Sequence, residues 1–211
     1  MFEVDRAIKF ANLLLSLDCV QVSPEKPYTY ASGLKGPIYT DNRQVLSHVP
    51  ERLEVAEGLC DLIRESGLKY DCIAGLATAG IPHGMLVAHI LGVPFIYVRS
   101  SAKAHGKTNQ IEGKYKAGDQ VILIEDLVNQ GSSLNKAIDA VKEAELIPMA
   151  CATIVDYQMP AAIEVIEKQK VPLFSLTNFA SISHAASADG GLTKESRELL
   201  NKWHKDPANW P

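Results

Sequence analysis

The chain has no long apolar run and no sign of a secretion signal. None of its stretches approaches the roughly 18 consecutive apolar residues that span a membrane. The first twenty residues contain Glu3 and Asp5 and no small-residue cleavage site, which is not the pattern of a signal peptide. We therefore expect a cytoplasmic protein that neither crosses nor binds a membrane.

Cysteine is scarce, with 4 in 211 residues. The four positions, each in apolar surroundings, are Cys19, Cys60, Cys72 and Cys151. Such wide spacing argues against a disulfide framework and against a zinc site. We expect reduced thiols in a hydrophobic core.

Positive charge is not in surplus, since the net charge is −4. This balance argues against general nucleic-acid binding. Residues 99–116 are an exception, with five basic side chains against a single acidic one, Glu112; the basic ones are Arg99, Lys103, Lys107, Lys114 and Lys116. A local cationic stretch on an acidic protein predicts a small anionic ligand.

The length and composition fit one α/β domain over residues 1–211. A hydrophobic content of 46% is enough for one sizeable core, and the sequence shows no internal repeat or low-complexity tract. Hydrophobic patterns predict strands at 71–75, 94–98, 121–125, 149–155 and 171–175. Helices are expected at 3–17, from Pro50 to Gly67, from 76–80 to Leu91, from 129–133 to about Ala144, at 161–168 and at 192–204. This alternation predicts a mostly parallel central sheet flanked by helices on both faces.

The central segment, Val121 to Ser133, combines a buried strand, an acidic pair and a Gly/Ser turn before a helix. Backbone N–H groups at the helix start, with the hydroxyls of Ser132 and Ser133, suit a phosphate. Glu125 and Asp126 suit ribose hydroxyls or a metal-bound ligand. The pattern predicts a site for a phosphorylated sugar, although an ordinary solvated strand end has the same composition.

Two other loops fall at the same edge of the expected sheet, because each follows the carboxyl end of a strand. The first, 76–80, is small and glycine-containing and suits a second phosphate group or simply close packing. The second, 99–113, is long and polar, as functional lids often are.

Residues 28–43 read as two short strands about a glycine-rich turn. Tyr28, Tyr30 and Tyr39 fit edge-strand packing. Lys35 and Arg43, which flank the turn, favour instead an anion or a polar ring.

With these segments placed, the chain resembles the type I phosphoribosyltransferases, and within them the orotate-using enzymes of bacterial pyrimidine synthesis. The resemblance covers nearly the whole chain. It rests on four segments in the same order: Tyr30 to Arg43, Ile73 to His83, Val98 to Gly113 and Ile124 to Ser133.

The resemblance implies that the protein is an enzyme, a pentosyltransferase. It would move the 5-phosphoribosyl group of phosphoribosyl pyrophosphate (PRPP) to N1 of orotate, releasing orotidine 5'-monophosphate and pyrophosphate on the way to UMP. It also implies Mg²⁺ carried by PRPP without a dedicated protein ligand, an N-terminal hood at about 1–45 that contributes to base binding, and a homodimer whose lid, 99–113, reaches the neighbouring site.

The resemblance also assigns the site residues. Catalytic roles fall to Lys103, His105, Arg99 and Asp126. PRPP would contact these and Thr78, Ala79, Gly80, Glu125, Asn129, Gln130, Gly131, Ser132 and Ser133. Orotate would contact Lys35, Tyr39, Arg43 and Asn129, with the planar guanidinium of Arg43 suited to its carboxylate.

The chain departs from the family pattern at three places. Ser100 and Ser101 stand where a second lysine is usual, Asn129 and Gln130 replace hydroxyl residues of the phosphate turn, and Asp156 stands near the expected acceptor wall. Two other functions therefore stay open: a paralogue that uses another base, and a protein that senses PRPP or a nucleotide with little turnover.

Overall fold

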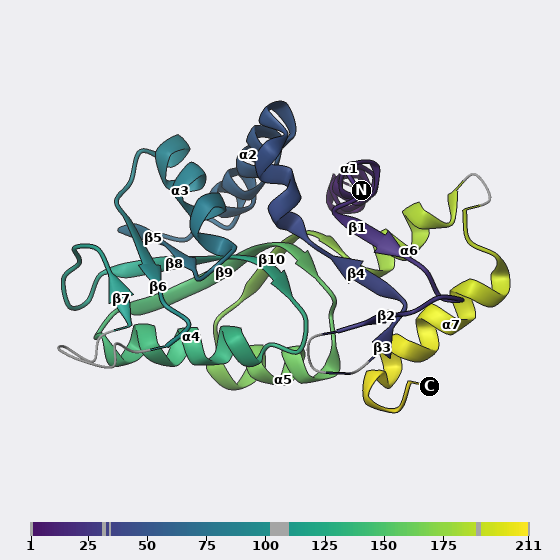
Figure 1. Cartoon of the computed structure of the whole chain (residues 1–211). Helices are drawn as coiled ribbons and strands as arrows, with labels where there is room; N and C mark the ends of the chain where they lie inside the picture. The colour runs from purple at the N-terminus through teal and green to yellow at the C-terminus, as the bar shows by residue number, and fades with distance from the viewer. Residues whose placement is uncertain (1, 31–32, 34, 102–109, 189–190, 211) are drawn as a thin grey trace.

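The computed structural model describes residues 2–30, 33, 35–101, 110–188 and 191–210. Figure 1 shows a central sheet between two layers of helices. Helices α2 (Val49–Glu65) and α3 (Gly80–Leu91) cover one face, and α4 (Ser132–Glu143) and α5 (Pro160–Gln169) cover the other. The predicted helices on both faces of the sheet are confirmed.

The sheet has six strands in the order β10-β9-β8-β5-β6-β7. Their bounds are β5 Cys72–Leu76, β6 Phe95–Val98, β7 Ile111–Glu112, β8 Gln120–Val128, β9 Ile147–Asp156 and β10 Leu173–Asn178. Neighbouring strands are parallel, except that β7 runs antiparallel to β6. The carboxyl ends of β5, β6 and β8 therefore lie side by side, as the sequence predicted.

Both faces of the sheet are buried, which explains the continuous apolar runs of its central strands. Successive side chains of a strand point to opposite faces. In β8, Ile122 and Ile124 pack into the core on the α2 and α3 side, whereas Val121 and Leu123 pack into the core under α4. The same strand thus holds both helical layers in place.

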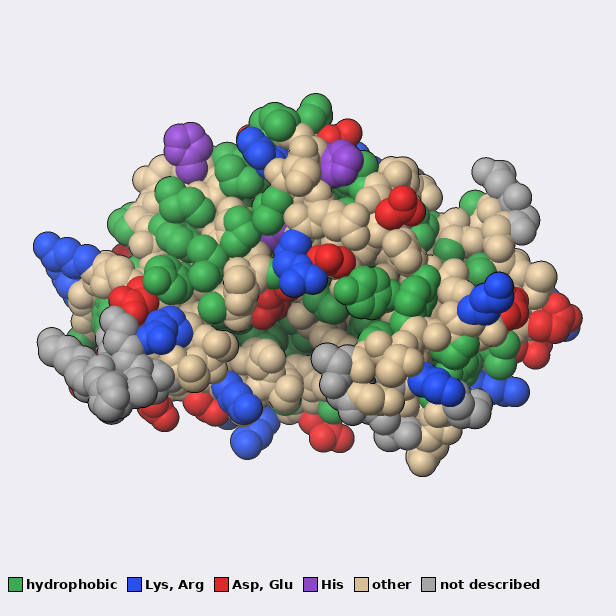
Figure 2. All heavy atoms as spheres, in the orientation of Figure 1, with side chains coloured by type: hydrophobic (Ala, Val, Ile, Leu, Met, Phe, Trp, Pro, Cys, Tyr) green, Lys and Arg blue, Asp and Glu red, His purple; other side chains and the backbone are tan. Residues whose placement is uncertain are grey.

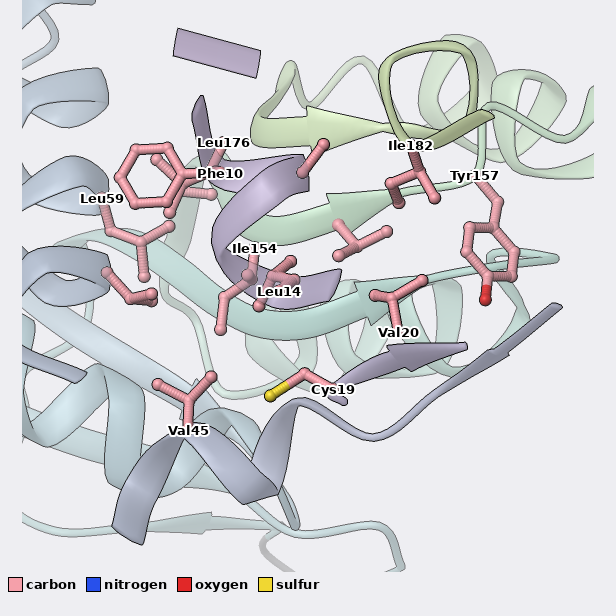
Figure 3. Close-up of a cluster of buried hydrophobic side chains, with 14 of the residues drawn as sticks. Phe10, Leu14, Cys19, Val20, Val45, Leu59, Ile154, Tyr157, Leu176 and Ile182 are labelled. Atoms are coloured by element: carbon pink, nitrogen blue, oxygen red, sulfur yellow. The ribbon is translucent and has the colours of Figure 1, made fainter. Parts of the chain in front are cut away.

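The N-terminal helix α1 (Phe2–Ser16) completes the first of these cores. Figure 3 shows Phe10 and Leu14 of this helix among Leu59 of α2, Ile154 of β9 and Leu176 of β10. None of these five side chains is more than 3% exposed. The helix therefore has a packing role, as its apolar period predicted.

The N-terminal hood, at about residues 1–45, consists of α1 and the segment that follows it, which ends near the carboxyl edge of the sheet. It contains β1 (Val20–Val22) paired antiparallel with β4 (Ile38–Thr40), β2 (Tyr28–Thr29) paired with β3 (Lys35–Gly36), and the 3₁₀ helix η1 (Asn42–Ser47). The hydroxyls of Thr40 and Tyr157 are hydrogen-bonded at 2.7 Å, so β4 rests on the turn that follows β9.

Helices α6 (Phe179–Ala186) and α7 (Lys194–Lys205) and the short 3₁₀ helix η3 (Pro207–Asn209) end the chain. The Thr193 side chain accepts a hydrogen bond from the Ser196 N–H, which confirms the capping pattern predicted for α7. Trp203 is buried against Tyr157 and Phe179, with ring centroids 5.9 Å away in each case. This aromatic cluster fixes α6 and α7 against the turn that follows β9.

Several elements differ from the sequence-based expectation. Strand β8 continues through the acidic pair to Val128, because Leu127 and Val128 still pair with β9. Strand β10 lies two to three residues later than expected. Strands β1 and β7 and helix α6 were not predicted: the two strands are short and depend on pairing with distant partners, and α6 is only 8 residues long.

The described residues contain no helix that is long and apolar enough to cross a membrane. All four cysteines are free and buried, so the prediction of reduced core thiols is confirmed.

Candidate active site

The turn between β8 and α4 forms a hollow of about 220 Å³. It is lined by Glu125 and residues 127–134. Gly131 is the N-cap of α4 and has φ 77° and ψ −3°, a left-handed conformation that glycine adopts without steric cost. Since Gly131 offers no side chain to cap the helix, the first N–H groups of α4 are open to a ligand. Ser132 and Ser133 are exposed beside them.

A second hollow of about 130 Å³ adjoins the first, because both are lined by Glu125 and Ser133. Its other lining residues come from the ends of β5 and β6, from the position before β7 and from α4: Leu76, Ala77, Val98, Arg99, Ser100, Gln110, Lys136 and Ala137. The positive charges of Arg99 and Lys136 therefore share this hollow with the buried carboxyl of Glu125. Together the hollows suit a ligand with two separate anionic groups.

Glu125 is only 8% exposed. Its Oε1 accepts a hydrogen bond of 2.9 Å from the backbone N–H of Asp126. Burial, followed by the charge of Asp126, raises the pKa of Glu125 well above its ordinary value. A carboxyl group here donates a hydrogen bond when it is protonated and accepts one from a hydroxyl when it is ionised.

Asp126 is connected to the hood. The Asn42 side chain donates a hydrogen bond of 2.8 Å from Nδ2 to the backbone carbonyl of Asp126. Arg43 forms an ion pair through Nε with Asp41, and this bond is the main reason that the pKa of Arg43 is raised, with a smaller contribution from Asp126. The cationic end of Arg43 is therefore at the surface, 61% exposed, within electrostatic reach of Asp126.

The loop after β5 lies next to the acidic pair. A Cβ added to Gly80 would lie 2.2 Å from the carbonyl oxygen of Ile124, so only glycine permits α3 to approach β8 this closely. Thr78 and Ala79, which precede it, are exposed and half-buried respectively. The peptide bond between Ala77 and Thr78 is cis. Of the two interpretations given for the loop 76–80, a phosphate group or close packing, close packing is thus part of its role.

The base of the loop 99–113 is a two-stranded stem. The N–H of Arg99 donates to the carbonyl of Gln110 at 2.9 Å, and the Gln110 side chain donates to the carbonyl of Arg99 at 3.1 Å. An ion pair of 3.8 Å joins Arg99 Nη1 to Glu112 Oε1. Arg99 thereby keeps its place beside the second hollow. Lys103 and His105 lie outside the described residues.

The predicted acceptor residues lie on the hood. Lys35 and Tyr39 are exposed, and the Tyr39 ring lies 5.6 Å from that of Tyr28. Asp156 does not extend freely toward them, because its Oδ1 accepts a hydrogen bond of 2.8 Å from the Gln158 N–H. The carboxylate that departs from the family pattern is thus engaged in its own turn.

Three residues of the site escaped the sequence analysis: Lys136, Gln110 and Asn42. Lys136 follows Ser132 by four residues on α4, so helical periodicity alone places it on the same face. Gln110 stands at the end of a polar loop, where no pattern distinguishes it. Asn42 binds a residue 84 positions away, a contact that a single sequence does not reveal.

Comparison with known proteins gives a consistent result. The phosphoribosyl transferase domain family matches residues 42–187. The orotate phosphoribosyltransferase of Enterococcus faecalis (strain ATCC 47077 / OG1RF) is 41% identical over 204 residues, which are 97% of each chain.

Solved structures share the fold. The orotate phosphoribosyltransferase of Aeropyrum pernix has a TM-score of 0.72 and 24% identity, and the match covers 82% of this chain and 96% of that one. The UMP synthase of Leishmania donovani has a TM-score of 0.78 and 26% identity. This match covers 94% of the present chain but only 42% of that protein.

Proposed function

Since the chain belongs to the phosphoribosyl transferase domain family, we propose that it transfers the 5-phosphoribosyl group of PRPP to orotate, releasing orotidine 5'-monophosphate and pyrophosphate. The observation that carries this assignment is a relative named for the reaction with 41% identity over 97% of both chains. The two joined hollows at the carboxyl edge of the sheet support it, because PRPP carries anionic groups at both ends of its ribose.

The donor extends across both hollows. Its 5-phosphate occupies the turn at 129–133, where backbone N–H groups at the α4 start and the hydroxyls of Ser132 and Ser133 donate to it. Its ribose hydroxyls face Glu125 and Asp126. Its pyrophosphate lies toward the loop 77–80 and the second hollow, which contains Arg99.

The reaction breaks the bond between ribose C1 and the pyrophosphate oxygen as N1 of orotate bonds to C1, and the N1 proton leaves to the pyrophosphate or to solvent. Positive charge develops on the sugar and negative charge on the leaving group. Arg99 and Lys136 lie where fixed positive charge stabilises that leaving group. The acidic pair lies where negative charge stabilises the sugar, so no covalent nucleophile is needed.

Magnesium fits this site as an ion that the substrate brings. Among the described residues, no group of three or more His, Cys, Asp or Glu side chains is placed to hold a metal ion. Mg²⁺ is usually bound mainly through substrate phosphates and waters, so PRPP itself can supply most of its ligands. Bound to PRPP, it would neutralise charge on the pyrophosphate.

Orotate binds under the hood, residues 1–45. Arg43 is the proposed partner of its carboxylate, with Lys35, Tyr39 and Asn129 beside the ring. The nearby charge of Asp126 and the exposure of the Arg43 guanidinium support this assignment. Asp41 holds Arg43 from one side, so the remaining N–H groups are free to meet a planar carboxylate.

The active unit is a homodimer in the cytoplasm. Hydrophobic side chains gather over α2 and α3 in Figure 2, and Val49, Leu53 and Met85 are 51%, 45% and 50% exposed there. An apolar surface of this kind is suited to a second copy. The four buried free cysteines fit a reducing compartment.

The lid, 99–113, reaches the neighbouring site: Arg99 at its base stays beside the donor site of its own subunit, and Lys103 serves the site of the other. Mixing inactive Lys103→Ala and Asp126→Asn proteins should regenerate activity, because one site of each hybrid dimer then has both residues intact. Absence of recovery, after subunit exchange has been verified, would place Lys103 in its own subunit's site.

The direct test follows the absorbance of orotate with PRPP and Mg²⁺. Loss of orotate that depends on both, with formation of orotidine 5'-monophosphate, is expected. Uracil is the control, since it lacks the carboxylate. Equal rates with uracil and orotate would favour a paralogue with another base, and donor binding without turnover of either base would favour a sensor, the function suggested by Asn129 and Gln130.

A further inference from the structure

A buried polar junction lies behind the donor site, between the hood, α3 and β8. It consists of Asn42, His83 and the backbone of Asp126. Asn42 and His83 are both fully buried, with 0% exposure. Neither ring nitrogen of His83 has a hydrogen-bond partner among the described residues, and neither does Asn42 Oδ1.

The fold brings these groups together for identifiable reasons. Gly80 allows the first turn of α3 to contact β8 at Ile124. His83 follows three residues later, and in a helix residues i and i+3 share a face, so its ring is directed toward the same strand. Asn42 comes from η1 and bonds to the Asp126 carbonyl at 2.8 Å. The junction therefore joins the hood to the acidic strand.

The electrostatics of the junction fix the form of the histidine. Burial lowers the pKa of His83, while the Asp126 carboxylate and the backbone of Asn42 act in the opposite direction. The net lowering leaves a neutral ring at physiological pH, with one N–H donor and one acceptor nitrogen. The backbone of Asn42 lies close enough to the ring to raise its pKa, although the contact does not meet hydrogen-bond geometry.

Unpaired polar groups this deeply buried destabilise the state that contains them. A leucine of similar volume would avoid that cost, so the polar groups call for a role in another state of the protein. The junction offers the His83 ring two polar partners: the unpaired Oδ1 of Asn42 and the carboxylate of Asp126, whose charge acts on the ring.

We propose that His83 is a positioning residue, which pairs with the Asn42 side chain when the donor binds and so fixes Asp126 against the ribose hydroxyls. This inference rests on the proposed donor site, and it adds a residue that touches no substrate. It also explains why Asn42 is held by the strand that carries Asp126. Binding of the donor and the position of the hood are coupled through this junction.

The test compares His83→Leu, which keeps volume but loses both polar atoms, with His83→Gln, which keeps a donor and an acceptor. His89→Leu is the matched control, because His89 is an exposed histidine on the same helix. Calorimetry with PRPP and Mg²⁺ measures donor binding, and steady-state kinetics give kcat/KM for each substrate. Thermal unfolding monitors the fold.

His83→Leu should weaken PRPP binding and lower kcat/KM for PRPP about tenfold or more, with a smaller change in KM for orotate. Its melting temperature should be unchanged or higher, since an unpaired buried polar group has been removed. His83→Gln should stay within about threefold of the wild type, as a retained donor and acceptor would allow. The double variant with His83→Leu and Asn42→Ala should lose less PRPP affinity than the product of the two single fold-losses, because both residues act through Asp126.

Wild-type PRPP affinity in His83→Leu would overturn the proposal. Equal losses of PRPP affinity in His83→Leu and His83→Gln, together with a lower melting temperature, would overturn it as well, because they would show that His83 has a purely structural role. The Gln variant and the control keep the test valid even if the Leu variant unfolds. The PRPP titration does not depend on the acceptor. If the wild-type protein binds PRPP but does not use orotate, the proposed reaction is refuted, whereas the role of His83 is still tested by the PRPP affinities of its variants.

Discussion

Gly131 offers a direct test of the phosphate turn, because its backbone is in the left-handed region with φ 77°. In Gly131→Ala the new Cβ would lie 3.0 Å from the Cα of Ala162 and 3.3 Å from its Cβ. The substitution therefore combines a conformational penalty with crowding against α5. Both effects should displace the backbone N–H groups that are proposed to hold the 5-phosphate.

The matched control is Gly92→Ala. Gly92 has φ 68°, and a Cβ added there meets nothing within 4 Å. A left-handed alanine costs about 1–2 kcal/mol, and the stiffer unfolded chain returns about 0.4–1 kcal/mol. We expect a net loss of roughly 1 kcal/mol for Gly92→Ala, or about 2–4 °C in melting temperature for a chain of this size.

Crowding makes the active-site change larger. Overpacking of a well-filled region costs about 1–3 kcal/mol, so Gly131→Ala should lose roughly 2–4 kcal/mol in total and melt about 5–15 °C lower. PRPP affinity should fall about tenfold or more, because one lost charge-assisted hydrogen bond is worth about 1.5–3 kcal/mol. The control should bind PRPP as the wild type does.

Differential scanning calorimetry and titration with PRPP and Mg²⁺, both below the lower melting temperature, measure the two effects. Wild-type PRPP affinity in folded Gly131→Ala would refute the placement of the 5-phosphate on this turn. Equal melting temperatures for the two variants would refute the argument from crowding by Ala162.

Three further predictions concern the charged residues. Burial raises the pKa of Glu125 in the folded state. The stability that the protonated side chain contributes is therefore fully present below the pKa of the unfolded state, about 4.5, and is lost as the pH rises through the pKa of the folded state. Glu125→Gln should therefore melt progressively higher than the wild type as the pH is raised from 4.5 to 8 in thermal unfolding experiments, on the reasoning that Gln mimics the protonated acid. Asp126→Asn and a chelator should each weaken PRPP binding in calorimetric titrations by about tenfold or more, and unchanged affinity in both would exclude the proposed donor site. Arg43→Ala should lower kcat/KM for orotate by about ten- to a hundredfold while donor affinity stays within about threefold, a smaller effect than for a buried pair because the side chain is 61% exposed. Loss of donor affinity and thermal stability together with activity would mean that Arg43 only braces the turn through Asp41.

The sheet and the placement of the turns at its carboxyl edge were predictable because local patterns and global topology agree in this chain. Val121 to Ile124 form an apolar run long enough for a strand, and the turn at 129–133 begins a helix with a clear apolar period. Right-handed connections between parallel strands then leave few ways to arrange the elements. The position of the turns at one edge follows from that topology.

Elements held by distant contacts were not predictable in the same way. Strand β7 has two residues, and its conformation depends on pairing with Tyr97 and Val98 of β6. The acidic pair resembled a strand end, yet pairing with β9 extends β8 to Val128. The bond from Asn42 to Asp126 joins segments that carry no mutual signal in the sequence.

Asn129 and Gln130, which depart from the family pattern, are tolerable in the proposed phosphate turn because its geometry comes from the backbone. Gly131 sets the left-handed N-cap, and α4 then begins with open N–H groups whichever side chains precede it. Asn129 and Gln130 lie before the glycine, with their amides 3.5 Å apart, and an amide can still donate to a phosphate oxygen. The phosphate should therefore keep its main-chain donors and the hydroxyls of Ser132 and Ser133. On this argument the departures at Asn129 and Gln130 alter the strength of donor binding more than its location.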